Sequence, residues 1–243
     1  MATLSIQLYT LRDQFESDRE ATLAALATMG LDEVEPFGIE HFDWLPEALA
    51  AHGLKAGSAH ADLIGSTDKV LAAAKALGVR TVFQPYWPAD KWQSGEGIRE
   101  LADALNGLVD RAAQAGLSIG YHNHDFEFTA PEVSGVGAYE YFVSLLDPRI
   151  VLEIDSYWAA AGGRYVPDLL KALGSRVTHL HIKDGTLQPS HSGAANVVLG
   201  TGRMDLPPIL DASADRVWVL EFDLAAVDPI EEVRQSVEYL KAR

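Results

Sequence analysis

The chain has 243 residues, of which 48% are hydrophobic, so it is long enough to bury one large core. It carries 19 Lys and Arg residues against 35 Asp and Glu residues, and this net charge of −16 opposes nucleic-acid binding, which needs basic side chains on phosphates. The lack of cysteine excludes disulfides, thiolate metal ligands and a cysteine nucleophile. Any chemistry must therefore depend on Asp, Glu, His and Lys.

The sequence shows no segment that would place the chain in a membrane. No apolar run reaches the length of about 18 residues that spans a bilayer. The first residues lack a basic stretch ahead of an apolar one. We therefore expect a cytoplasmic protein whose partners include neither membrane nor nucleic acid.

Eight strand-like runs alternate with helix-like stretches along the chain. Five of the helix-like stretches end at a glycine, the residue that most easily adopts the left-handed turn after a helix. The predicted strands lie at residues 5–10, 33–35, 56–58, 81–83, 119–121, 150–157, 177–179 and 217–222. The predicted helices lie at about residues 19–29, 43–52, 68–77, 97–115, 136–146, 165–173, 206–212 and 229–241.

Eight alternating units predict an α/β fold, a single (β/α)8 TIM barrel over residues 1–243. The alternative is an open, doubly wound sheet. The loop after the first predicted strand, at residues 11–14, lacks the glycines with which such sheets hold a pyrophosphate.

The longest irregular stretch, Gly185–Met204, follows the seventh predicted strand. In a TIM barrel this position lies on the active face, which predicts a cover over the substrate; the alternative is a mobile surface excursion.

Polar residues gather where the last four predicted strands end, in residues 120–127, 152–158, 179–184 and 219–223. The period of two along a strand places alternate residues on one face, and one face of each strand points into the barrel. Carboxylates and imidazoles that converge there repel or desolvate one another unless a cation lies among them. Such mixed ligands suit Mn²⁺, Co²⁺, Zn²⁺ or Mg²⁺, so we predict one divalent metal ion. The alternative is a hydrogen-bonded polar network without metal.

Three segments carry a resemblance to a known family: Tyr121–Phe128 (YHNHDFEF), His181–Asp184 (HIKD) and Leu199–Asp205 (LGTGRMD). With them, the chain resembles the sugar phosphate isomerase/epimerase family of xylose-isomerase-like TIM barrels, which also includes inosose dehydratases and keto-sugar epimerases. The resemblance implies a metal held by Asp155, His181 and Glu221. The family commonly adds a glutamate in a Glu-x-His pattern, where this chain has His122-Asn123-His124. We predict His122 as the fourth ligand, with Glu127 as the alternative.

The resemblance also implies an activity, namely a metal-dependent isomerase or epimerase that acts on a sugar, keto-sugar or cyclitol through an enediolate. His124 or Glu127 would be the base, and Lys183 would stabilise the enediolate. The predicted substrate contacts are Glu35, His60 and Trp158. The alternatives are a dehydratase or lyase acting on a keto-sugar or inosose, and a sugar-binding barrel without catalysis. Because such barrels often form dimers or tetramers, the resemblance is compatible with a homo-oligomer.

Overall fold

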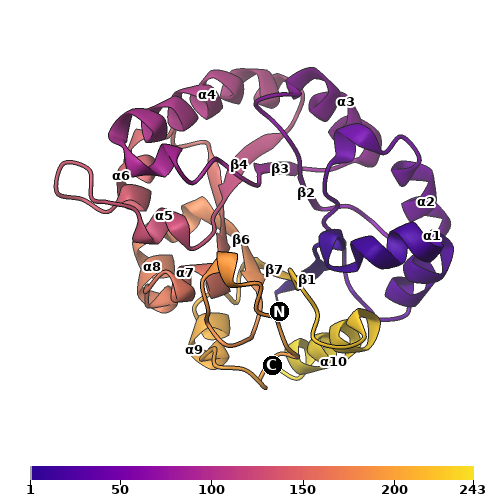
Figure 1. Cartoon of the computed structure of the whole chain (residues 1–243). Coiled ribbons are helices and arrows are strands. Elements are labelled where there is room, and N and C mark those ends of the chain that lie inside the picture. The colour runs from indigo at the N-terminus through magenta and orange to yellow at the C-terminus, as the bar shows by residue number, and fades with distance from the viewer. Residues whose placement is uncertain (1) are drawn as a thin grey trace.

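The computed structural model describes residues 2–243, and its parallel strands curl into a barrel that is ringed by helices (Figure 1). The sheet runs in the order β1-β7-β6-β5-β4-β3-β2, and every pair of neighbours is parallel. The strands are β1 (Thr3–Ile6), β2 (Ser58–His60), β3 (Thr81–Gln84), β4 (Ser118–His122), β5 (Val151–Asp155), β6 (Val177–Ile182) and β7 (Val217–Leu220). The expected xylose-isomerase-like barrel is confirmed in architecture.

The gap between β1 and β2 is closed by residues 33–37, which include the strand predicted at residues 33–35. This segment makes only isolated bridges to its neighbours. The Glu35 amide donates to the Ile6 carbonyl of β1, and the Val34 amide donates to the segment before β2, each at 2.8 Å. Pro36 has no amide hydrogen and interrupts the ladder. The prediction of a regular second strand is therefore wrong, although the segment still closes the barrel.

Ten α-helices cover the outside of the barrel in the described part of the chain. They are α1 (Arg12–Ala27), α2 (Leu45–Ala51), α3 (Thr67–Leu77), α4 (Gly95–Gln114), α5 (Phe126–Thr129), α6 (Ala138–Leu145), α7 (Ser156–Ala161), α8 (Val166–Leu173), α9 (Leu206–Asp211) and α10 (Pro229–Lys241). None of these helices is long and apolar enough to cross a membrane.

Three predicted strands were too long, and the last of them, predicted at residues 217–222, ends at Leu220. The first ends at Ile6 and leads into a 3-10 helix, η1 (Leu8–Leu11). The strand β5 ends at Asp155, because the Asp155 side chain accepts a hydrogen bond of 2.8 Å from the Trp158 amide and starts α7.

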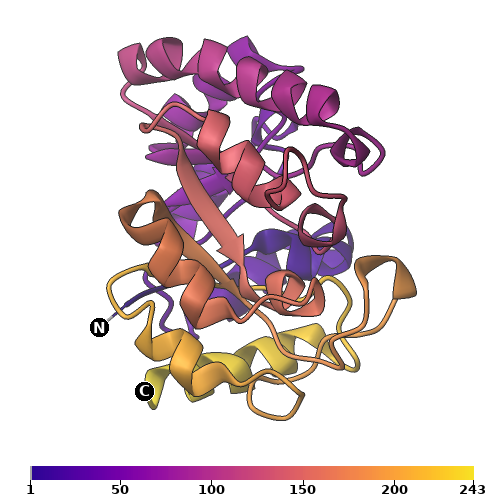
Figure 2. The ribbon, with the colours of Figure 1, turned by 90° about the vertical axis from the view of Figure 1, so that its left-hand side faces the viewer.

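The strands separate an apolar layer from a polar interior. In β6, Leu180 and Ile182 are fully buried in the apolar core, while His179 and His181 alternate with them and point inward. Seen from the side, β1 begins and α10 ends at one end of the barrel, and the strands point to the other (Figure 2). The strand ends that carry polar residues therefore meet at one mouth.

Candidate functional site

The register of the sheet brings the polar strand ends together. His122 of β4 pairs with Glu153 of β5, and Asp155 of β5 pairs with His181 of β6. Paired residues of parallel strands share a face, so all four side chains point into the barrel. They form two overlapping groups at different depths.

The upper group contains the four predicted metal ligands, His122, Asp155, His181 and Glu221. Each offers one ligand atom, these atoms lie within 4.8 Å of one another, and all four residues are buried. Two imidazoles and two carboxylates form a donor set that suits a divalent transition metal ion. The structure thus brings together the residues that the sequence analysis selected, and their chemistry fits a metal.

Lys183 lies beside the upper group and is fully buried. Its Nζ is 2.8 Å from Asp155 Oδ2, 2.6 Å from Glu221 Oε2 and 2.7 Å from Asp223 Oδ2. Burial opposes the charge, but the three carboxylates outweigh it and raise the pKa of Lys183 well above its usual value. The ammonium therefore shares two carboxylates with the candidate metal site.

Asp223 was not predicted, although it is two residues beyond Glu221 and thus at the next inward position. Trp158, a predicted substrate contact, lies next to Lys183, with Nζ 5.4 Å from the centre of the indole ring. Trp158 is only 6% exposed.

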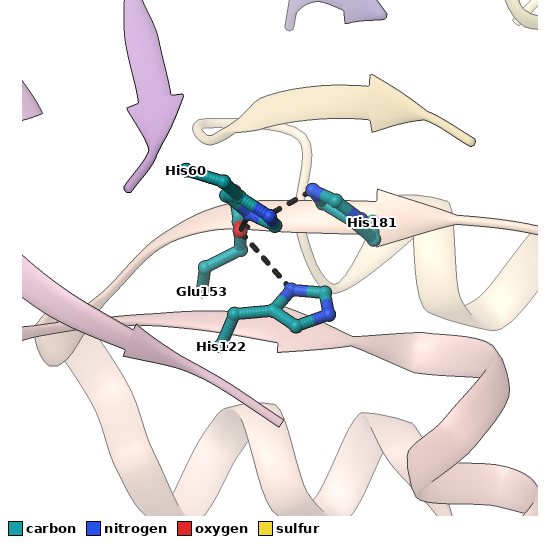
Figure 3. A group of neighbouring side chains, drawn as sticks. All are labelled: His60, His122, Glu153 and His181. Atoms are coloured by element: carbon teal, nitrogen blue, oxygen red, sulfur yellow. Dashed lines mark hydrogen bonds and ion pairs between the residues drawn. The ribbon is translucent and has the colours of Figure 1, made fainter. Parts of the chain in front are cut away.

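The deeper group consists of three histidines around one carboxylate oxygen (Figure 3). Glu153 Oε2 lies 2.5 Å from His60 Nε2, 3.1 Å from His122 Nδ1 and 3.2 Å from His181 Nε2. Burial raises the pKa of Glu153, but the neighbouring histidines lower it to well below its usual value. The other oxygen, Oε1, is buried and has no hydrogen-bond partner. Glu153 was not among the predicted site residues.

The structure places Glu35 at the base of the site. Its Oε1 accepts a hydrogen bond of 2.9 Å from Gln7 and lies 2.8 Å from His181 Nε2. Its Oε2 accepts a hydrogen bond from Ser58. Glu35 is fully buried, whereas His60 lines the mouth above it. Of these two predicted substrate contacts, His60 is the one that borders the cavity.

The two central imidazoles face both groups. His181 places Nδ1 2.8 Å from Glu221 Oε2 and Nε2 next to Glu35 and Glu153. Burial opposes its charge, but Glu153 and Glu221 raise the pKa of His181 well above normal. Burial and the nearby His181 lower the pKa of His122, which favours the neutral form that binds metals.

His124 lies just beyond the end of β4 and lines the mouth. Its amide donates to Glu127 Oε2 at 2.8 Å, and its Nδ1 lies 3.9 Å from Glu127 Oε1. Burial opposes protonation, but Glu127 raises the pKa of His124. Glu127 also accepts a hydrogen bond of 2.9 Å from the Tyr121 hydroxyl and is fully buried. Glu127 thus lies behind His124.

Asn123 was not predicted and supports the site through the backbone. Its Oδ1 accepts a hydrogen bond of 3.0 Å from the Asp155 amide, and its Nδ2 donates to the Asp155 carbonyl at 3.3 Å. The side chain thus extends the pairing of β4 and β5 by one rung. No periodic signal marks such a residue, because Asn123 points away from the histidines on either side of it.

A cavity of about 520 Å³ opens at the mouth, a size typical of small-molecule sites. The histidines at positions 60, 122 and 124 line it together with Glu221 and Asp223. Tyr9 and Phe37 form part of its rim. The cavity therefore gives a ligand access to both the upper group and His124.

Comparison with known proteins identifies the family. The model of the xylose isomerase-like TIM barrel family matches residues 23–243, and the chain belongs to this family. The inosose dehydratase of Lacticaseibacillus casei is 26% identical over 239 residues, which cover 90% of this chain and 74% of that protein. The expected resemblance to the xylose-isomerase-like TIM barrels, with inosose dehydratases among the relatives, is confirmed.

Solved structures share the fold. A sugar phosphate isomerase/epimerase from Parabacteroides distasonis superposes with a TM-score of 0.83 at 23% identity, covering 100% of this chain and 95% of that one. The IOLI protein, whose structure contains a zinc atom, superposes with a TM-score of 0.69 at 20% identity, covering 99% of this chain and 96% of that one.

Proposed function

We propose that this protein is a divalent-metal-dependent isomerase or epimerase of a sugar, keto-sugar or cyclitol that acts through an enediolate. The ligands would be His122, Asp155, His181 and Glu221, and the ion would be Mn²⁺, Co²⁺, Zn²⁺ or Mg²⁺. The zinc atom in the IOLI structure supports a metal in this fold.

The observation that carries the proposal is the charge of the site. Five carboxylates, those of Glu35, Glu153, Asp155, Glu221 and Asp223, surround one ammonium, that of Lys183, and three imidazoles. Apart from Asp223, these carboxylates are buried. Buried anions in such excess need a counter-charge. A divalent cation in the upper group supplies it.

A bound divalent cation supplies Lewis-acid polarisation of a carbonyl and an adjacent hydroxyl. The chain's own residues then transfer the proton and stabilise the negative charge. His124 is the group at the mouth that takes a proton from the α-carbon and returns it. Glu127 accepts a hydrogen bond from the His124 amide, and its carboxylate favours a positive charge on the His124 ring, 3.9 Å away. Lys183, whose ammonium contacts Asp155, Glu221 and Asp223, would place a positive charge near the oxygen on which negative charge develops.

Dehydration is the second candidate, because the L. casei relative is named inosose dehydratase. Both reactions begin with the same α-proton removal. They differ in the next step, in which a β-hydroxyl either stays or leaves. The residues at the mouth serve either outcome.

Metal content tests the ligand set directly. We expect about one equivalent of a divalent ion in the purified wild type, and loss of the ion in Asp155→Ala and His181→Ala. His52→Ala is the control, since His52 pairs with Glu20 at the end of α2, outside the two groups described above. A wild type that takes up none of the four metals would contradict the proposal.

Exchange of an α-proton in D₂O tests the chemistry. The metal-loaded protein is incubated with keto-sugars and inososes, and deuterium uptake is followed by NMR. We expect His124→Ala to slow exchange by about 100-fold, the scale of general acid–base catalysis, while it retains its metal. A product spectrum that differs from that of the substrate but keeps every hydroxyl indicates isomerisation. A product that has lost one water molecule indicates dehydration. Absence of exchange across the panel would argue against enolisation.

A further inference from the structure

A second cavity adjoins the mouth of the barrel. It has a volume of about 450 Å³ and lies between residues 8–19, which form η1 and the first turns of α1, and residues 36–45. Tyr9 and Phe37 line both this cavity and the mouth. We call it the aromatic groove. These two residues therefore lie between the groove and the mouth.

Four aromatic rings line the aromatic groove in a row that leads away from the mouth. The ring centres of Tyr9 and Phe37 are 5.2 Å apart, those of Phe37 and Phe42 are 5.9 Å apart, and those of Phe42 and Trp44 are 5.5 Å apart. All four residues are partly exposed, and Tyr9 reaches 40%. Nothing in the proposed chemistry of the upper group uses these rings.

Charged side chains border the row in balanced numbers. Arg12 and Arg19 line the groove together with Asp13 and Glu16. The Arg12 guanidinium lies 4.2 Å from the Tyr9 ring centre, and that of Arg19 lies 3.6 Å from the Trp44 ring centre. A groove with two positive and two negative groups around aromatic rings suits a neutral, hydroxyl-rich ligand better than an anion.

Arg12 also connects the groove to the candidate active site. Its Nη2 donates a hydrogen bond of 3.0 Å to the carbonyl of Asp223, whose carboxylate holds Lys183. The Arg12 side chain thus links the groove to the residues around the candidate metal site. A ligand that spans both would pass over Tyr9 and Phe37.

We propose that the aromatic groove binds a second, neutral sugar ring that is linked to the reacting sugar, so that the substrate class is a disaccharide or similar glycoside. This inference rests on the proposed function for the reacting ring. C–H faces of a sugar pack against the rings, and the flanking carboxylates and guanidinium groups bond to its hydroxyls. A phosphate group at this position would meet Asp13 and Glu16 as well as the two arginines, so the groove offers an anion no net positive charge.

Binding by calorimetry tests this assignment, with glucose, maltose, cellobiose, trehalose and sucrose as probes of the metal-loaded wild type. We expect at least one disaccharide to bind about tenfold more tightly than glucose. Trp44→Leu and Phe42→Leu should weaken that disaccharide roughly five- to tenfold, the effect of losing one aromatic contact, and leave glucose unchanged. Trp87→Leu is the matched control, because the Trp87 indole bonds to the Gly97 carbonyl of α4 and lies outside the groove. Thermal unfolding verifies that each variant folds.

Three results would overturn the proposal. In the first, no disaccharide binds the wild type more tightly than glucose does. In the second, Trp44→Leu weakens the binding of glucose and of the disaccharide by the same factor. In the third, p-nitrophenyl glucoside binds more tightly than every disaccharide and loses affinity in Trp44→Leu, which would assign the groove to an aryl group. Failure of the proposed function looks different, because α-proton exchange would then be absent while the preference for a disaccharide and its dependence on Trp44 persist.

Discussion

His122 and His181 each present one ring nitrogen to a carboxylate of the deeper group and the other to the upper group. Since Glu153 lies 3.1 Å from His122 Nδ1, that nitrogen is the donor, and Nε2 keeps its lone pair toward Asp155 Oδ2, 4.0 Å away. Carboxylates that hold a ligand histidine in this way fix its tautomer and raise its basicity. Glu153 therefore prepares the imidazoles that a metal would use.

Glu153→Gln should lower the affinity for Mn²⁺ or Co²⁺ by about 10- to 100-fold, because the shape of the side chain is kept and its charge is lost. Competition with a fluorescent chelator measures the change. Glu33→Gln is a matched control, since Glu33 is also buried but pairs with Arg80. Equal affinities of wild type and Glu153→Gln would show that the carboxylate does not act on the ligands.

Period-two alternation was enough to predict that His122, Asp155 and His181 share the barrel interior, because each stands at or next to the end of a strand. Depth was not predictable. Glu35 and His60 look equivalent in the sequence, yet only His60 lines the cavity, while Glu35 is fully buried behind it. The tilt and stagger of strands in a closed barrel decide this depth, and no local pattern encodes them.

At the scale of elements, the Gly185–Met204 loop is organised around one carboxylate. Asp184 Oδ1 accepts hydrogen bonds from the amides of Gly185 (2.8 Å) and Met204 (3.0 Å), and Oδ2 accepts from those of Gly200 and Gly202 (both 2.9 Å). The short Gly-Thr-Gly pattern thus encircles an anion supplied by the chain itself. This explains the glycines without any bound phosphate.

Gly202→Ala should destabilise this loop, because a Cβ at Gly202 would overlap the Asp184 carboxylate and the Gly185 amide. We expect a loss of about 1–3 kcal/mol in the free energy of unfolding, the range for disrupting a buried hydrogen-bonded group. Urea denaturation measures it, and limited proteolysis reports whether the loop opens. Gly107→Ala is the control, since a Cβ there meets nothing within 4 Å. An unchanged urea midpoint would contradict the account.

The turn between α6 and β5 gives a pH prediction. Arg149 donates hydrogen bonds to both carboxylate oxygens of Asp147, at 3.0 and 2.8 Å, and lowers the Asp147 pKa to about 2. A depressed folded-state pKa contributes stability above the unfolded value of about 3.9, and this contribution is lost as the pH falls toward the folded value. The stabilising effect of this pair should therefore decline below about pH 4 and be lost near pH 2.

Arg149→Ala should return the Asp147 pKa toward its ordinary range, which a carbon-detected NMR titration of the carboxyl group measures. Asp110→Asn removes the other partner of Arg149, at 2.7 Å, and leaves the Asp147 contacts in place. The pKa of Asp147 should stay low in that variant. Equal shifts in both variants would contradict the assignment to Arg149.

Helix ends were the most predictable elements. The five glycines at which predicted helices ended all have positive φ, from 59° at Gly174 to 77° at Gly116. The segment at residues 33–37 was less predictable, because alternating polar and apolar residues suggest a strand even where a proline interrupts the hydrogen-bond ladder. Its bridges depend on β1 and β2, which are distant in the sequence.

At the scale of the whole molecule, an excess of acidic residues runs from the surface to the centre. The net charge of −16 means that the buried carboxylates of the upper and deeper groups lie in a molecule that already repels added negative charge. A metal ion that bound only the folded chain, as we propose, would relieve this repulsion where it is strongest. Its effect should therefore appear in global stability.

Saturating Mn²⁺ or Co²⁺ should stabilise the metal-free protein by about 2.7 kcal/mol at a free metal concentration of 100 times the Kd. For a chain of this size that corresponds to a rise in Tm of roughly 5–10 °C. Differential scanning calorimetry after EDTA treatment and dialysis measures it. The Asp155→Ala variant should lose most of this rise in Tm, because it removes a ligand.

NaCl at matched ionic strength separates ligation from general screening of the acidic surface. If NaCl or the Asp155→Ala variant reproduced the full rise, the stabilisation would come from surface charge, and the buried carboxylates would not be holding the ion.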